Sequence, residues 1–169
     1  KYQDQFIKKH NTKLGFMSFF VKASVNSLQS FPHLNAELHQ DELIVKRYYD
    51  IGIAVATDEG LVVPVLRSAD KLSSAEIEQG IAELATKSRD KKITLQELQG
   101  GTFSITNGGV FGSLMSTPLL NPPQVGILGM HKIMEKPIAV DGEVVVRPVM
   151  MLAVTYDHRI IDGAMAVQF

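Results

Sequence analysis

The amino-acid sequence predicts an α/β fold, a two-layer sandwich in which helices cover a mixed β-sheet. Short segments rich in Ile, Val and Leu, bounded by Gly and Pro, are typical of strands. Two capping boxes mark the starts of helices. Strands arranged as in hairpins alternate with these helices, which favours a mixed sheet over a doubly wound parallel one. The 169 residues, 45% of them apolar, suffice for one domain with a hydrophobic core.

Four segments are predicted to be helical, and a fifth is predicted to form a short capped turn. Residues 16–31 carry apolar side chains at helical spacing and are followed by a proline, which predicts an amphipathic helix with a defined end. Residues 1–11 are interpreted as the tail of another helix. The capping box at 73–76 begins a helix, and the one at 94–97 precedes a short turn that ends at Gly100-Gly101. A last helix is expected to start near Asp162.

The strands are predicted from runs of β-branched and other apolar residues. They are expected at 42–47, 51–57, 61–66, 102–106, 125–128 and 143–156. Pro64 indicates an edge or a bulge, and Pro148 is expected to interrupt the last strand. Between the strands lies a long loop, 107–124, rich in Gly, Pro, Asn and Ser.

The glycine-rich part of this loop, Gly101–Gly112, does not match a nucleotide-binding motif. It contains neither Gly-Lys-Ser/Thr nor G-x-G-x-x-G after a strand. We expect its glycines to let the backbone turn sharply after Thr106 and approach another segment closely. A site-lining or subunit-contacting loop is favoured over a plain connector.

Composition limits the classes of function. The net charge is −1 with no Lys/Arg block, so neither nucleic acid nor an anionic membrane is expected as a partner. No apolar run is long enough to span a bilayer. Cysteine is absent, which excludes disulfides, thiolate metal sites and a cysteine nucleophile. No metal is expected, because the histidines and carboxylates lack a three-ligand spacing.

The segment T-Y-D-H-R-I-I-D-G, residues 155–163, places ionisable side chains directly after an apolar strand. We expect His158 to lie at the end of the sheet in a low-dielectric environment, where the neutral imidazole can accept a proton. Asp162 follows four residues later and either shares a helix face with His158 or holds Arg159 or a neighbouring loop. A zinc site is weakly supported, and a Ser-His-Asp hydrolase lacks the G-x-S-x-G elbow. A general base acting on a substrate's nucleophile and a purely structural histidine both remain open.

Asp157–Gly163 resembles the D-H-R-x-x-D-G motif of the dihydrolipoamide acyltransferases, the E2 components of 2-oxo acid dehydrogenase complexes. The resemblance covers the chain in order. Its further blocks are Leu14–Ala23, Pro32–Ala36, Asp50–Arg67, Gly100–Gln124 and Ile127–His131. Phe103–Pro118 together with Asn121–Gln124 is similar to the succinyl-transferring members of the family.

The resemblance implies a chloramphenicol acetyltransferase-like fold and transfer of a succinyl group between a dihydrolipoyl arm and coenzyme A. His158 would act as general base on the thiol, and the Thr106 hydroxyl would stabilise the tetrahedral oxyanion. Asp162 would organise the site. Ser116 and His131 could bind the succinyl carboxylate. No acyl-enzyme is required.

The resemblance also implies partners and surroundings. Members form homotrimers with active sites at subunit boundaries, and the trimers build a core of about 24 subunits that binds the E1 and E3 components. Coenzyme A is a substrate, and the lipoyl group comes from a domain not in this chain. Residues 1–169 are thus expected to be one catalytic domain, truncated at both ends, without lipoyl and peripheral-subunit-binding domains. Its expected location is the bacterial cytoplasm, or the mitochondrial matrix in a eukaryote.

Ala164 departs from the succinyl pattern, in which a basic residue commonly follows the motif, whereas acetyl-transferring relatives often have alanine there. Two alternatives therefore stay open: transfer of an acetyl or branched-chain acyl group, and a scaffold core without turnover.

Overall fold

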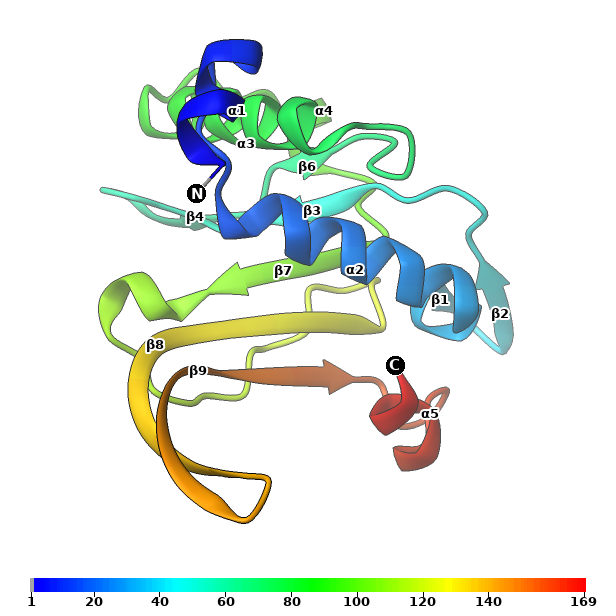
Figure 1. The fold of residues 1–169 in the computed structure, drawn as a ribbon. Coiled ribbons are helices and arrows are strands. Elements are labelled where there is room, and N and C mark those ends of the chain that lie inside the picture. The colour runs from blue at the N-terminus through cyan, green and yellow to red at the C-terminus, as the bar shows by residue number, and fades with distance from the viewer. Residues whose placement is uncertain (1) are drawn as a thin grey trace.

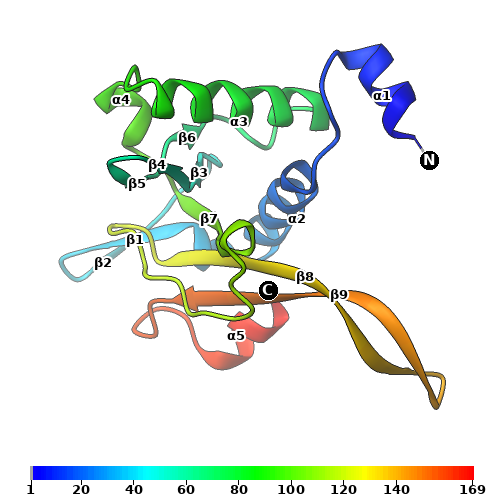
Figure 2. The same ribbon diagram turned by 90° about the vertical axis from the view of Figure 1, so that its left-hand side faces the viewer.

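A computed structural model describes residues 2–169 of the chain. Helices pack on one side of a five-stranded sheet whose strand order is β6-β3-β7-β8-β9 (Figures 1 and 2). The central pairs β3–β7 and β7–β8 are parallel, whereas β6 and β9 pair antiparallel at the two edges. The predicted α/β sandwich with a mixed sheet is therefore confirmed.

The four predicted helices are present among the described residues, and the short turn predicted after the second capping box is a one-turn helix. They are α1 (Gln3–His10), α2 (Phe16–Ser30), α3 (Ser74–Arg89), α4 (Leu95–Leu98) and α5 (Gly163–Gln168), with 3-10 turns η1 (Pro32–Asn35) and η2 (Gly108–Phe111). Both capping boxes form as expected. Ser73 and Thr94 accept hydrogen bonds from backbone N–H groups three residues on, and the glutamates there reach back to the capping residues. Lys1, part of the first predicted helix, lies outside the described residues.

The strands are shorter in the first half of the chain than predicted. They are β1 (Ala36–His39), β2 (Glu42–Val45), β3 (Ile51–Ile53), β4 (Val55–Thr57), β5 (Gly60–Val62), β6 (Val65–Leu66), β7 (Phe103–Asn107), β8 (Gly126–Val140) and β9 (Glu143–Tyr156). The predicted strands 51–57 and 61–66 are each divided in two. Pro64 lies at the second break and has no N–H to donate to a ladder. β4 and β5 leave the main sheet as a separate hairpin.

The prediction for the last two strands was wrong in length. β8 continues twelve residues beyond the predicted end at Leu128, and β9 runs through Pro148 without interruption. The two strands extend past the sheet as a curved arm (Figure 2). In such a two-stranded ribbon each strand has outward-facing N–H positions without a partner, where a proline loses no hydrogen bond. The tip is Asp141-Gly142, both with positive φ, as a two-residue hairpin turn requires.

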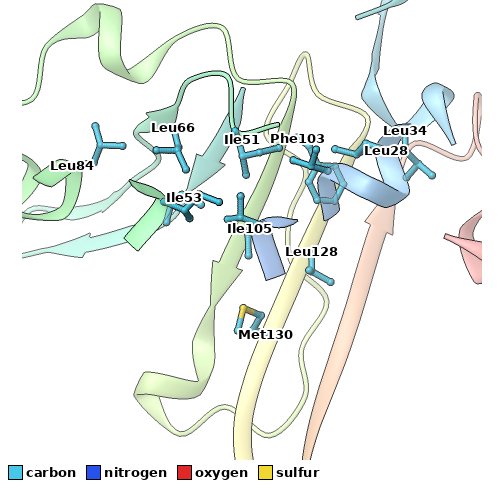
Figure 3. Close-up of a cluster of buried hydrophobic side chains, with 14 of the residues drawn as sticks. Leu28, Leu34, Ile51, Ile53, Leu66, Leu84, Phe103, Ile105, Leu128 and Met130 are labelled. Carbon is cyan, nitrogen blue, oxygen red and sulfur yellow. The ribbon is translucent and has the colours of Figure 1, made fainter. Parts of the chain in front are cut away.

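The hydrophobic core lies between the sheet and helices α2 and α3. Leu28 of α2 and Leu34 meet Ile51, Phe103 and Ile105 of the sheet, and all five side chains are fully buried (Figure 3). Side chains alternate along a strand, so the residues between them face the other side.

Because of this alternation, polar side chains of β7 lie on the opposite face of the sheet. Phe103 and Ile105 of β7 point into the helix-covered core. Ser104 and Thr106 therefore face the side away from the helices, where a cavity forms.

Candidate active site

A cavity of about 360 Å³ opens on the face of the sheet away from the helices. Its floor comes from β7 and β8, and its outer wall from the loop that follows η2. The lining residues include Ser104, Thr106, Ile127 and Gly129 on the strands and Ser116, Pro118, Leu119, Leu120 and Asn121 in the loop. A mostly apolar cavity of this size with a few hydroxyl groups suits a small organic ligand.

Glycines allow the loop to come this close. A Cβ on Gly109 would lie 2.5 Å from the backbone carbon of His131, so only glycine fits where η2 meets β8. A Cβ on Gly129 would lie 3.2 Å from the Pro118 ring, which packs over β8 beside the cavity. Gly112 turns the chain with a φ of 87°. The predicted sharp turn and close approach of the glycine-rich segment are thus confirmed.

Thr106 and Ser116, two of the predicted site residues, are brought together in this cavity. Thr106 is half-buried near the end of β7, and Ser116 is exposed on the loop. Beside them, the buried Ser104 hydroxyl donates to Oε1 of Gln124 at 2.6 Å, so that hydroxyl is already engaged.

His131 lies behind the cavity wall. Its side chain is 1% exposed, and both ring nitrogens have partners within the chain. Nδ1 is 2.8 Å from the carbonyl oxygen of Met151. Nε2 accepts the backbone N–H of Ser116 at 2.8 Å and lies 3.0 Å from its hydroxyl. His131 therefore has no free ring nitrogen to offer an acyl group while Ser116 stays in place.

His158 is exposed, and the expectation that it lies in a low-dielectric environment is wrong for a single chain. It follows the end of β9, and its ring lies beside Tyr156 with centroids 5.5 Å apart. The expectation assumed that the preceding apolar strand is buried. β9 is instead the edge strand of the sheet, so its end is open to solvent.

Asp162 caps helix α5, as its Oδ1 accepts the backbone N–H of Met165 at 2.7 Å. It does not hold Arg159, which was one of the open possibilities. Asp157 does so instead: its Oδ1 accepts from the Arg159 Nε at 3.0 Å and from the Arg159 backbone N–H at 3.0 Å. The guanidinium lowers the pKa of the Asp157 carboxyl below its usual value. Asp157 was not among the predicted site residues, although the D-x-R spacing across a turn was an available signal.

The register of the sheet separates Thr106 from His158. Thr106 pairs with Gly129 on β8, and Gly129 pairs with Ala153 on β9. His158 lies five residues beyond Ala153 (158 − 153), past the end of the strand. Tyr156 is two strand spacings across the sheet from Thr106 and three residues further along β9 than Ala153. Strand geometry therefore places the two residues roughly 14 Å apart. One chain therefore does not bring the predicted base and the predicted oxyanion donor together.

Residues 2–169 contain no group of three or more His, Asp or Glu side chains placed to hold a metal ion. Over the same range, no helix combines the length and apolar character that crossing a membrane requires.

The fold defines the class of protein. A solved chloramphenicol acetyltransferase superimposes with a TM-score of 0.57, covering 98% of this chain and 78% of that chain. At 14% identity, this similarity shows a shared fold alone. The atomic structure of the cubic core of the pyruvate dehydrogenase multienzyme complex matches with a TM-score of 0.93 and 38% identity, covering 98% of this chain and 69% of that one. The domain has the architecture of acyltransferase catalytic domains.

The chain belongs to the family of 2-oxoacid dehydrogenases acyltransferases (catalytic domain), which it matches over residues 1–169. Two curated relatives are named dihydrolipoyllysine-residue succinyltransferase component of 2-oxoglutarate dehydrogenase complex. The one from Bacillus subtilis is 64% identical over 99% of this chain, and the one from Rickettsia bellii is 59% identical over 100%. The chain spans 40% and 42% of the lengths of these relatives.

The turn that carries His158 should depend on the Asp157–Arg159 ion pair. Because the pKa of Asp157 is lowered, the ion pair stabilises the turn fully at pH values above the ordinary aspartate pKa of about 3.9. The stabilisation is lost as the pH falls through the lowered pKa of Asp157. We expect Asp157→Asn to speed amide hydrogen exchange of residues 157–161 at neutral pH. Asp141→Asn, at the far hairpin tip, is the matched control. Equal exchange in both variants would contradict this role.

Proposed function

We propose that the chain is the catalytic domain of an acyltransferase that moves a succinyl group between a dihydrolipoyl arm and coenzyme A. Two relatives with 64% and 59% identity, both named as succinyltransferases, support the choice of acyl group. The cavity beside Thr106 supports acyl transfer as such, because its apolar walls and hydroxyl groups suit a thioester. Both substrates would be thiols or thioesters supplied from outside the chain.

In this proposal His158 is the general base. A free thiol with a pKa of about 8.5 is mostly protonated at neutral pH, so an attacking thiol must lose its proton. The neutral imidazole of His158 takes that proton as the sulfur attacks the thioester carbonyl. When the tetrahedral intermediate collapses, the imidazolium returns the proton to the leaving thiol. No covalent bond to the protein is needed.

Thr106 is proposed to donate its hydroxyl to the oxyanion that forms at the attacked carbonyl. The hydroxyl lies in a cavity whose other walls are largely apolar, and in such surroundings a hydrogen bond to developing charge is strengthened. Asp162 is proposed to organise the site through its cap on α5, which follows His158 after a short turn. Ser116, on the cavity wall, is proposed to donate to the succinyl carboxylate, and His131 to support it from behind.

The observation that carries the proposal is the separation of the two halves of the site. His158 is exposed at one end of the sheet, and the Thr106 cavity opens at the other. In a ring of identical chains, the exposed turn of one copy can close the cavity of the next. We therefore propose a homotrimer, assembled into a cubic core like the solved relative, that works with E1 and E3 components. The relatives are bacterial, and a cytoplasmic location is proposed accordingly.

Single substitutions test the assigned chemistry in the full-length, assembled protein. We expect His158→Ala to lower kcat for acyl transfer from acyl-CoA to dihydrolipoamide by about a hundredfold to ten-thousandfold. Thr106→Val should lower it by about a hundredfold or more, whereas Thr106→Ser keeps the hydroxyl and most of the rate. His39→Ala, at an exposed position on β1, is the control. A fully active His158→Ala enzyme would contradict the assignment of His158 as the general base.

A second acyl group has one observation in its favour, because Ala164 replaces the basic residue expected of succinyltransferases. The ratio of kcat/KM for succinyl-CoA and acetyl-CoA decides between them. We expect a preference for the succinyl donor that falls by about tenfold to a hundredfold in Ser116→Ala, since a hydrogen bond to a carboxylate is lost. An acetyl preference in the unaltered protein would contradict the proposed substrate.

A further inference from the structure

A β-bulge interrupts the pairing of β8 and β9 beside the cavity. Met130 pairs with Leu152 and Ile133 pairs with Met150, so three steps along β8 match two along β9. The extra residue lies at His131-Lys132. Bulges of this kind redirect a side chain. Here the imidazole of His131 is buried while the neighbouring Lys132 is exposed.

The partners of the buried ring determine its protonation state. The Met151 carbonyl can only accept a hydrogen bond, so Nδ1 at 2.8 Å must carry the proton. The Ser116 backbone N–H can only donate, so Nε2 at 2.8 Å must present its lone pair. The ring is therefore neutral, with its hydrogen on Nδ1.

The segment that this ring holds has little other attachment. Among the described residues, the hydrogen bonds of 114–120 run from Ser116 to His131 and to no other group. Before it, Ser113 is fixed by its carbonyl, which accepts from Lys132 at 2.8 Å. The side chains of Leu119 and Met115 are 89% and 67% exposed, so they add little packing. Yet this segment supplies the outer wall of the cavity that contains Thr106.

We propose that His131 is a positioning residue: its neutral ring anchors residues 113–121 to the bulge and so fixes the cavity wall opposite Thr106, without touching the acyl group. The anchor stands on these hydrogen bonds alone. Its effect on acyl transfer rests on the proposed function.

Protonation of His131 would undo the anchor. It would place an N–H on Nε2, directed at the Ser116 amide, where both groups can only donate. The segments packed around the ring, namely residues 112–121, η2 and residues 149–153, contain no titratable side chain. Lys132, next to the ring in sequence, is exposed.

Hydrogen exchange of residues 113–121 in the full-length, assembled protein tests the anchor. We expect His131→Leu to reduce the protection factors of this segment by about tenfold, the loss of a buried hydrogen bond. His131→Gln retains one donor and one acceptor and should recover most of the protection.

Ser116→Ala separates the anchor from the chemistry. It keeps the backbone N–H that His131 accepts at 2.8 Å and removes only the hydroxyl contact at 3.0 Å, so most of the protection of 113–121 should remain while the proposed contact with the acyl carboxylate is lost. In parallel, His131→Leu should lower kcat/KM for succinyl-CoA, and His131→Gln should restore it.

Unaltered protection in His131→Leu, or no recovery in His131→Gln, would overturn the proposal. If His131→Leu does not fold, His131→Phe, which fills the space without a ring nitrogen, takes its place, and unaltered protection in it would equally overturn the proposal. If the hydrogen-exchange results are as expected but the unaltered protein transfers no acyl group, the proposed function is contradicted and the anchoring role of His131 is not.

Discussion

The arrangement of the whole site depends on the pairing register of β7, β8 and β9. Parallel pairing puts Thr106 level with Gly129, and antiparallel pairing puts Gly129 level with Ala153. Since β9 then continues toward the other end of the sheet, the turn with His158 cannot fold back onto the Thr106 cavity. A slip of one residue would move Thr106 into the helix-covered core and Ile105 into the cavity. The register thus fixes which side chains line the cavity and how far Thr106 lies from His158 within one chain.

The same two strands supply surfaces suited to a second copy of the chain. Beyond the sheet, the β8–β9 arm packs on no helix, and Val144 and Val146 on it are 78% and 59% exposed. An isolated two-stranded ribbon has little stability of its own, and contiguous exposed apolar side chains commonly mark an interface. These properties agree with the proposed trimer, in which the arm and the open face of the sheet would be covered. The bulge at His131 lies where the arm leaves the sheet.

Local signals in the sequence predicted much of this structure. Capping boxes located α3 and α4, and Asp162 at the start of α5 was anticipated, because caps involve neighbouring residues only. The Asp-Gly turn at 141–142 was an available sign of the long hairpin, yet the prolines argued against it. What could not be predicted depends on contacts between distant segments. The burial of His158 was inferred from an apolar strand, and only the strand order reveals β9 as an edge.

The same difference between local signals and contacts of distant segments applies to the candidate site. The D-H-R-x-x-D-G resemblance identified His158 and Asp162, but Asp157 as the partner of Arg159 needed the geometry of the turn. Ser116 and His131 were chosen as polar residues, in the blocks that resemble the family, that could bind the succinyl carboxylate. Their mutual hydrogen bond depends on a bulge that no local sequence pattern predicts. Sequence patterns thus identified the candidate site residues. Only the fold shows which of their side chains line the cavity and which hold other residues in place.

Mixing two inactive variants tests most directly whether the site lies between copies. His158→Ala and Thr106→Val chains, inactive alone, are co-assembled in equal amounts, and acyl transfer is measured. If each site combines His158 of one chain with Thr106 of its neighbour, random assembly makes about one site in four intact and recovers about a quarter of the unaltered activity. Activity no higher than that of the separate variants, with mixed assembly verified by mass, would contradict the account.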